Sequence, residues 1–328
     1  MVVRIISAVV PYVGGGEMQV ARVAEELRSL GIAVEDGIVS MHVPDVVHIF
    51  GTHPRIHAPI VQHCSAKGIG CVITPVFFPA PHKSWDRLRL TVQRTLTRWG
   101  VLDGGPGHFQ GAATMLRRAA VVLPNTHEEA TLVRAWFPGL ARVEVVPNGV
   151  DTDWIVADGP MTAESGEKFV LTVGRLEPRK NQLRLARACS GLGVRLVVVG
   201  DTAVDPRYAA ACAKVRGVQL LGALPPRSIA LRTMLRAAHV FALPSWCETP
   251  GIAALEAAAA GCNVVVTSVG GAKEYLGNCA EYVSASSTSE IMLSLNRSLQ
   301  LPRGARGIPR FPSWREVAER YASVYNSL

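Results

Sequence analysis

Short apolar runs of strand length alternate with helix-length segments along almost the whole chain. The apolar runs cover residues 3–10, 45–51, 70–78, 119–125, 142–151, 168–174, 194–201, 218–222, 239–245 and 263–268. Most segments between them have the length of helices, at residues 14–31, 55–68, 126–137, 181–193, 207–217, 226–238, 251–261 and 270–277. Buried strands rich in Val, Ile and Leu that alternate with helices are typical of parallel sheets covered on both faces. The pattern therefore predicts an α/β protein with doubly wound parallel sheets.

A polar stretch at residues 159–168 interrupts this alternation, which restarts after it. Its Gly, Pro and Ser content is typical of a linker. We therefore expect two α/β domains, an N-terminal one over residues 1–158 and a C-terminal one over residues 159–311. Residues 312–328 have the periodicity of a terminal amphipathic helix.

The composition agrees with a globular protein, because 48% of the 328 residues are hydrophobic and only 18% are charged. The net charge of +8 favours an acidic partner, such as phosphate or an anionic membrane. Basic residues are scattered along the chain, except for a cluster formed by Arg87, Arg89, Arg94 and Arg98. No nucleic-acid motif or basic patch with interleaved aromatic residues occurs, so we expect no nucleic-acid partner.

The seven cysteines are odd in number and include no C-x-x-C pair, and most lie in apolar surroundings. They are typical of reduced, buried thiols in a cytoplasmic protein. The first ten residues predict a buried strand rather than a signal peptide. No segment reaches the about 18 consecutive apolar residues of a transmembrane helix. We expect a cytoplasmic protein whose membrane contact, if present, is peripheral and on the inner face.

The first candidate site is the glycine triplet Gly14–Gly16, between the first predicted strand and the first helix. Glycines there allow a ligand to approach the backbone, and the start of a helix attracts anions. A plain tight turn explains the triplet equally well.

The second candidate site contains two cations, Arg175 directly after the strand end at Gly174 and Lys180 at the start of the next helix. Arg can bind a phosphate in a bidentate way and Lys acts as a point charge, so the two could clamp a diphosphate. Two solvated surface cations are the ordinary alternative, and spacing alone favours it.

The third candidate site contains Glu248 and Glu256, which have seven residues between them. Thr249-Pro250-Gly251 predicts a turn into a helix, so Glu248 precedes the helix at a strand end and Glu256 follows about two turns later. A carboxylate among Ala and Leu needs a polar partner, and sugar hydroxyls would supply one. A favourable helix dipole explains Glu248 without a ligand, and an exposed helix position explains Glu256.

Other polar patterns carry less information. The pair Gly270–Gly271 precedes a helix with Glu274 in its first turn, which indicates either a backbone N–H site or a plain loop. Asp151 and Asp153 form an Asp-x-Asp sequence, which we interpret as part of a connection rather than as a metal site. The histidines between residues 42 and 63 lack the spacing of a metal site.

Three stretches together resemble the retaining, GT-B-fold glycosyltransferases of family 4, the glycosyl transferases group 1. They are VVPNGVD at residues 145–151, VGRLEPRKN at residues 173–181 and LPSWCETPGIAALEAAAAGCNVVVTSVGGAKEYLG at residues 243–277. Glu248 and Glu256 match the Glu-x7-Glu signature of this family. The resemblance is dense from Val170 to Val283 and weaker in the N-terminal half. It favours the functional interpretation of each candidate site above over its structural alternative.

The resemblance implies two Rossmann-like domains facing a cleft, with residues 312–328 crossing back to the N-terminal domain. The C-terminal domain would hold a nucleoside-diphosphate sugar. Arg175 and Lys180 would stabilise the diphosphate as leaving group and Glu248 would contact the donor sugar, so these three are the expected catalytic residues. Glu256 would bind the ribose. The other expected donor-binding residues are Gly15, Gly16, Gly174, Leu224, Gly251, Ile252 and Ala253.

The same resemblance implies a retaining reaction that needs no metal, cofactor or protein nucleophile. The acceptor would be a sugar or lipid-linked hydroxyl in cell-surface polysaccharide or glycolipid synthesis. One departure concerns the N-terminal half, where many family members carry a His at a position that here holds Phe77 and Phe78. His82 is nearby but out of register, so no catalytic His is assigned.

Two alternatives are kept. One is another GT-B enzyme, such as a nucleotide-sugar epimerase, which the Glu-x7-Glu pairing with Arg175 and Lys180 disfavours. The other is a non-catalytic subunit that binds a sugar nucleotide for a partner enzyme, which the missing His keeps open.

Overall fold

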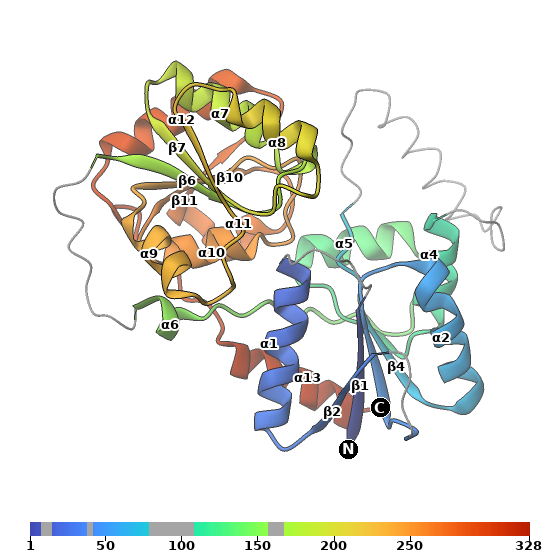
Figure 1. Cartoon of the computed structure of the whole chain (residues 1–328). Helices are drawn as coiled ribbons and strands as arrows, with labels where there is room; N and C mark the ends of the chain where they lie inside the picture. Colours follow the sequence, from blue (N-terminus) through green and yellow to red (C-terminus); the bar gives the residue numbers. More distant parts are fainter. Residues whose placement is uncertain (8–14, 38–41, 79–107, 157–166) are drawn as a thin grey trace. The chain divides into compact units, whose positions relative to one another are not determined.

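The computed structural model describes residues 1–7, 15–37, 42–78, 108–156 and 167–328. The chain divides into two compact units, the first made of Met1–Gly149 with Pro312–Leu328 and the second of Val150–Phe311 (Figure 1). The division therefore follows Gly149, whereas most of the linker expected at residues 159–168 lies outside the described residues.

The first unit contains a five-stranded parallel sheet in the order β2-β1-β3-β4-β5. Its strands are β1 (Val2–Ser7), β2 (Ala33–Asp36), β3 (Val46–Phe50), β4 (Gly70–Thr74) and β5 (Val121–Val122). The pairing places Ile5 of β1 beside Asp36 of β2 and His48 of β3, and His48 beside Val72 of β4. The order reverses at β1, so this sheet is doubly wound as the sequence predicted.

Helices cover both faces of this sheet. They are α1 (Gly15–Ser29), α2 (Pro54–Lys67), α4 (His108–Arg118), α5 (His127–Trp136) and α13 (Trp314–Asn326). In Figure 1, α1 and α13 lie on one side of the sheet, and α2 and α4 lie on the other. Apolar side chains of α2, α4 and α5 form one core with Ile6, Val47, Ile49 and Ile73 of the strands.

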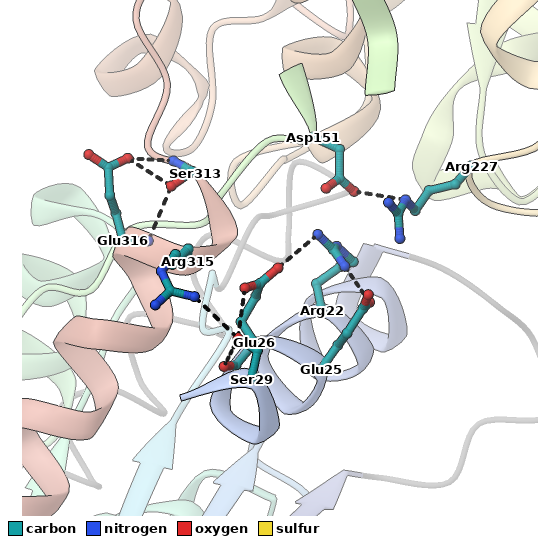
Figure 2. Close-up of polar contacts among 9 residues, drawn as sticks. All are labelled: Arg22, Glu25, Glu26, Ser29, Asp151, Arg227, Ser313, Arg315 and Glu316. Atoms are coloured by element: carbon teal, nitrogen blue, oxygen red, sulfur yellow. Dashed lines mark hydrogen bonds and ion pairs between the residues drawn. The ribbon is translucent and has the colours of Figure 1, made fainter. Parts of the chain in front are cut away.

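The C-terminal helix α13 packs against α1 and belongs to the first unit, although it follows the second unit in sequence. Ser313 and Glu316 form a capping box at its start, as the dashed lines in Figure 2 show. The helix buries Tyr321 and Tyr325, and the Tyr325 hydroxyl lies 2.6 Å from Nδ1 of His48. Burial lowers the pKa of His48 to about 3, so its imidazole is neutral.

The second unit contains a six-stranded parallel sheet in the order β11-β10-β9-β6-β7-β8. Its strands are β6 (Phe169–Val173), β7 (Arg195–Val199), β8 (Val218–Gly222), β9 (Val240–Leu243), β10 (Asn263–Thr267) and β11 (Ala280–Val283). The helices are α6 (Thr152–Val156), α7 (Gln182–Gly191), α8 (Pro206–Ala213), α9 (Ile229–Ala237), α10 (Ile252–Ala259), α11 (Ala272–Leu276) and α12 (Thr288–Gln300).

Strand residues of this unit alternate between two cores, because successive side chains of a strand point to opposite faces. Leu171 and Phe241 face the core that contains α9 and α10, whereas Val170 and Ala242 face the core that contains α7 and α12. Both faces of this sheet are therefore buried, which explains why its strands are apolar along their whole length. The two parallel-sheet units confirm the predicted α/β fold class.

One predicted strand is only a partial strand. The run at residues 142–151 hydrogen-bonds along β5, but it forms a single isolated bridge between Val143 and Val122. Pro147 removes one backbone donor and Asn148-Gly149 has turn composition, so the run becomes the connection into the second unit.

Candidate functional site

The candidate site lies within the second unit, where the strand order reverses between β6 and β9. Gly174 and Arg175 follow β6, and the loop after β9 reaches Glu248. The two strands are parallel neighbours, so both segments leave the same edge of the sheet. Open α/β sheets bind ligands at the carboxyl edge beside such a reversal. The reversal therefore brings predicted cations and predicted carboxylates together.

Lys180 and Glu248 form a buried ion pair, with Nζ 2.7 Å from Oε1 and side chains that are 14% and 5% exposed. Lys180 ends the short 3-10 turn η1 (Pro178–Lys180), and the carbonyl of Arg179 in this turn accepts a hydrogen bond from the Trp246 N–H. Burial lowers the pKa of Lys180, although Glu248 opposes this effect. Burial alone would raise the pKa of Glu248, but Lys180 and Arg179 outweigh it and hold that pKa below its usual range.

Arg175 lies beside this pair in a small charged cluster. Its Nη2 is 3.5 Å from Oε1 of Glu177, which also accepts a 3.2 Å hydrogen bond from Nε of Arg179. Arg179 additionally donates to the carbonyl of Cys247. Arg175 was predicted from the sequence, whereas Arg179 was not, because its only signal was its place beside Lys180. The cluster has three cations and two carboxylates, so one positive charge is available to an anion.

A loop after β10 fixes the backbone of Glu248. The Glu248 N–H donates to the Val269 carbonyl at 3.2 Å, and the Gly271 N–H donates to the Glu248 carbonyl at 2.9 Å. Gly270 has a φ of +102°, and a Cβ there would lie only 2.1 Å from the Glu248 carbonyl oxygen. The predicted glycine pair therefore holds Glu248 in place, while Glu274 lies in the first turn of α11 as predicted.

Helix α10 begins at Ile252, directly after the N-cap residue Gly251, and no side chain caps this end. The N–H groups of the first turn, including those of Ile252 and Ala253, have no carbonyl one turn earlier to accept them. An anion placed there would meet free donors and the positive end of the helix dipole. Pro250 of the predicted turn directly precedes this N-cap residue.

Glu256 lies in the second turn of α10 and is 8% exposed. Neither a hydrogen bond nor an ion pair to Glu256 occurs within the part of the chain that the structure describes. Burial raises its pKa to about 8, and the nearby charge of Asp151 adds to this effect. Glu248 and Glu256 therefore have opposite surroundings. Glu248 forms an ion pair with Lys180, whereas Glu256 has no partner among the described residues.

Asp151 forms an ion pair with Arg227, whose Nε lies 3.7 Å from Oδ2 (Figure 2). The Asp151 side chain is 8% exposed. In sequence, Asp151 directly precedes α6, which packs against α10. Asp151 was predicted from the sequence to be part of a connection, and its position near Glu256 was not predicted. Only the PNGVD stretch could have signalled it.

Two further predicted residues end strands at the same sheet edge. The Gly174 N–H donates to the Val199 carbonyl at 2.9 Å, which continues the β6–β7 ladder by one bond. Leu224 follows β8 and packs partly buried against the core under α9 and α10, whereas its neighbours Ala223 and Pro225 are exposed. The loop at residues 223–225 after β8 is therefore apolar and largely exposed, and it lies at the same edge of the sheet as the candidate site.

In the first unit, Gly15 and Gly16 are the first two residues of α1, and Gly14 lies outside the described residues. A Cβ at Gly16 would meet no atom of the described chain within 4 Å, so packing does not demand glycine there. Phe77 is 6% exposed and packs against Trp136 and Phe137. This side chain is therefore part of the core.

Glu129, which was not predicted from the sequence, is completely buried in the first unit. Its two carboxylate oxygens accept hydrogen bonds from the N–H groups of Phe77, at 2.5 Å, and Asn125, at 2.8 Å. Thr126 caps α5 by accepting from the Glu129 N–H. The Thr-x-x-Glu spacing was the available signal, since it is typical of a capping box.

Two kinds of feature are not found in the described part of the chain. No group of three or more His, Cys, Asp or Glu side chains there could hold a metal ion. None of its helices combines the length and the apolar character of a transmembrane span. The basic cluster at Arg87, Arg89, Arg94 and Arg98 lies outside the described residues, as does His82.

The family described as glycosyl transferases group 1 matches residues 167–300, the segment that carries the site. A D-inositol 3-phosphate glycosyltransferase of Mycobacterium bovis is 32% identical over 233 residues, covering 66% of this chain and 48% of that protein. The corresponding protein of Mycobacterium avium is 34% identical over 175 residues, covering 49% and 41%. The chain thus spans less than half the length of these curated relatives.

Solved structures share the fold over nearly the whole chain. Sucrose-phosphate synthase from Thermosynechococcus elongatus superposes with a TM-score of 0.77 at 16% identity, covering 99% of this chain and 98% of that one. HepE from Anabaena, solved in complex with UDP and glucose, gives a TM-score of 0.73 at 18% identity, covering 99% and 100%. The chain has the GT-B fold, and its residues 167–300 match the model of the glycosyl transferases group 1.

Proposed function

We propose that this chain is a glycosyltransferase that moves a sugar from a nucleoside-diphosphate sugar to a hydroxyl acceptor. The observation that carries the proposal is the arrangement at the β6–β9 reversal. The cations follow β6, and an uncapped helix start and a buried carboxyl group without a partner among the described residues follow β9, within the segment that matches the group 1 family.

The cations and the start of α10 would bind the diphosphate. Arg175 and Lys180 supply positive charge, and the first-turn N–H groups at Ile252 and Ala253 supply hydrogen-bond donors. Arg179 would assist by holding Glu177 and the Cys247 carbonyl. Such preorganised charge stabilises the negative charge that develops on a leaving diphosphate.

The two glutamates would bind the sugars at the two ends of the diphosphate. Glu248 is held by Lys180 and by the Gly270 loop, so its carboxylate has a fixed position from which to accept a donor-sugar hydroxyl. Glu256 would bind the ribose hydroxyls, which would provide the partner it lacks among the described residues. The loop at Gly222–Leu224 would contact the nucleobase.

We propose that the reaction retains the anomeric configuration. The bond between the anomeric carbon and the phosphate oxygen breaks, and its electron pair stays on that oxygen. The acceptor oxygen bonds to the anomeric carbon from the same face, and its proton passes to the leaving phosphate oxygen. Arg175 and Lys180 would stabilise this oxygen throughout, so the scheme uses neither a protein nucleophile nor a metal.

The acceptor is proposed as a chemical class, and the location as a compartment. We propose a sugar or lipid-linked hydroxyl in cell-surface polysaccharide or glycolipid synthesis, at a cytoplasmic site with peripheral contact to an anionic membrane. The relatives named for D-inositol 3-phosphate also make a phosphorylated polyol a reasonable acceptor to test. Gly15 and Gly16 at the start of α1 would take part in donor binding.

The test is product formation. Purified protein is incubated with UDP-, GDP- or ADP-sugars and a panel of hydroxyl acceptors, and nucleoside diphosphate and glycoside are quantified. UDP-glucose is the first donor, because HepE was solved with UDP and glucose. Released diphosphate with an equal amount of glycoside of unchanged anomeric configuration supports the proposal. Formation of an epimerised nucleotide sugar would favour the epimerase, and donor binding without any turnover would favour a non-catalytic subunit.

A further inference from the structure

Glu248 and Glu256 are buried to a similar extent but differ in their partners. Glu248 is 5% exposed and has the Lys180 ammonium 2.7 Å away. Glu256 is 8% exposed, and none of the described residues offers it a cation or a hydrogen-bond donor. An ionised carboxylate in such surroundings has a large desolvation cost, so the protonated form is favoured.

The charge of Asp151 makes ionisation of Glu256 still less favourable. Asp151 directly precedes α6, which packs against α10, and its side chain is 8% exposed. Asp151 also forms an ion pair with Arg227, whose Nε lies 3.7 Å from Oδ2. A carboxylate close to a buried carboxyl group disfavours the ionisation of that group, which is the effect of Asp151 on Glu256.

Charged groups on the other elements around α10 do not reverse this effect. Elements β9, β10, α6, α9 and α11 pack against α10. Their charged and titratable residues are Asp151 and Asp153 at α6, Arg232 and Arg236 on α9, His239 before β9, and Lys273, Glu274 and Tyr275 on α11. Among these described groups, only Asp151 joins burial in raising the pKa of Glu256, which reaches about 8.

We propose that Glu256 works as a neutral carboxylic acid, donating one hydrogen bond to the donor's ribose diol and accepting another, with Asp151 as the positioning residue that keeps it protonated. The proposal rests on the proposed function, because it assigns the ribose to Glu256. A neutral acid places no additional negative charge near the bound diphosphate. Its hydroxyl proton also gives the diol a donor that a carboxylate lacks.

The test compares nucleoside diphosphate binding to wild type, Glu256→Gln and Glu256→Ala from pH 6.5 to pH 9.5. UDP, GDP and ADP are titrated calorimetrically, and the one that binds wild type is used throughout. Gln resembles the neutral acid in shape and also donates and accepts. We expect Glu256→Gln to bind within about threefold of wild type at pH 6.5, and Glu256→Ala to bind at least tenfold more weakly.

The ratio of the wild-type Kd to the Glu256→Gln Kd isolates the titration of Glu256, since Lys180 and the phosphates contribute equally to both. This ratio should rise about thirtyfold between pH 6.5 and pH 9.5, with proton uptake on binding above pH 8 in wild type only. Asp151→Asn should move the rise to lower pH, whereas Asp153→Asn, at an exposed carboxylate two residues away, should not.

Two results would overturn the proposal while leaving the proposed function intact. One is a ratio that stays flat with pH. The other is a Glu256→Gln variant that binds as weakly as Glu256→Ala while keeping the melting temperature of wild type. If none of the three nucleotides binds wild type, the proposed function fails and this proposal fails with it.

Discussion

Nζ of Lys180 lies 2.7 Å from Oε1 of Glu248, and this contact joins the loop after β6 to the loop after β9. The two residues come from separate sequence motifs, and each loop leaves the sheet where the strand order reverses. The pair therefore has two effects. It fixes a cation beside the carboxyl ends of the strands, and it gives a buried carboxylate its hydrogen-bonded counter-charge.

The first prediction concerns the stability of this pair. Lys180→Met should lower the free energy of unfolding by about 3–5 kcal/mol, because it leaves the Glu248 carboxylate buried without its hydrogen-bonded cation. Urea denaturation measures this loss. The double variant Lys180→Met, Glu248→Gln should recover most of it, and Lys214→Met, at an exposed lysine of the same unit, should have little effect. Equal losses in Lys180→Met and Lys214→Met would contradict the buried pair.

The second prediction concerns Glu256 and pH, independently of any ligand. The pKa of Glu256 is about 8 in the folded protein and near its ordinary value of about 4.3 in the unfolded chain. Between these values the folded state binds more protons, so stability from this group is present at low pH and is lost as pH rises towards 8. Glu256→Gln removes the titration. Its melting temperature relative to wild type should therefore increase from pH 5 to pH 8.5, and a constant difference would contradict the raised pKa.

The site motifs were predictable from the sequence because they follow the ends of strongly apolar strands. Runs such as residues 168–174 and 239–245 are buried on both faces, so their ends could be located and the residues that follow could be assigned to one sheet edge. The strands β2 and β11 were not predicted. They have four residues each, lie at sheet edges, and carry charged residues such as Glu35 and Glu281 that hide the apolar pattern.

Long-range pairings could not be predicted in the same way. The contact between Lys180 and Glu248 spans 68 residues, and the proximity of Asp151 to Glu256 spans more than 100. Such contacts depend on the strand order, which the alternation of apolar runs does not specify. The capping of α5 was predictable in principle from Thr126 and Glu129, but the donation from Phe77 to Glu129 required the fold.

The third prediction concerns Glu129 in the first unit. Glu129→Ala should destabilise the protein by about 1–3 kcal/mol for each buried N–H group that loses its acceptor, namely those of Phe77 and Asn125. Glu128→Ala, at the exposed neighbouring position, should have a much smaller effect. Chemical denaturation of both variants compares them, and similar losses would show that the buried hydrogen bonds contribute nothing specific.

The fourth prediction concerns the loop that holds Glu248. Gly270→Ala places a methyl group 2.1 Å from the Glu248 carbonyl oxygen and imposes a positive φ on alanine. The loop must then shift, so sugar transfer should fall at least tenfold together with a loss of stability. Gly277→Ala also has a positive φ, but its methyl group would meet no described atom within 4 Å. If both variants retain the same transfer rate, the close approach at Gly270 has no functional role.

The central claim is that the cations at the β6–β9 reversal bind the diphosphate of a sugar nucleotide. The most direct test is a calorimetric titration of the nucleoside diphosphate that binds wild type into the double variant Arg175→Gln, Lys180→Gln, with folding checked by circular dichroism. Each charge-assisted hydrogen bond contributes about 1.5–3 kcal/mol, so the Kd should rise at least a hundredfold. An unchanged Kd in a folded double variant would contradict the claim.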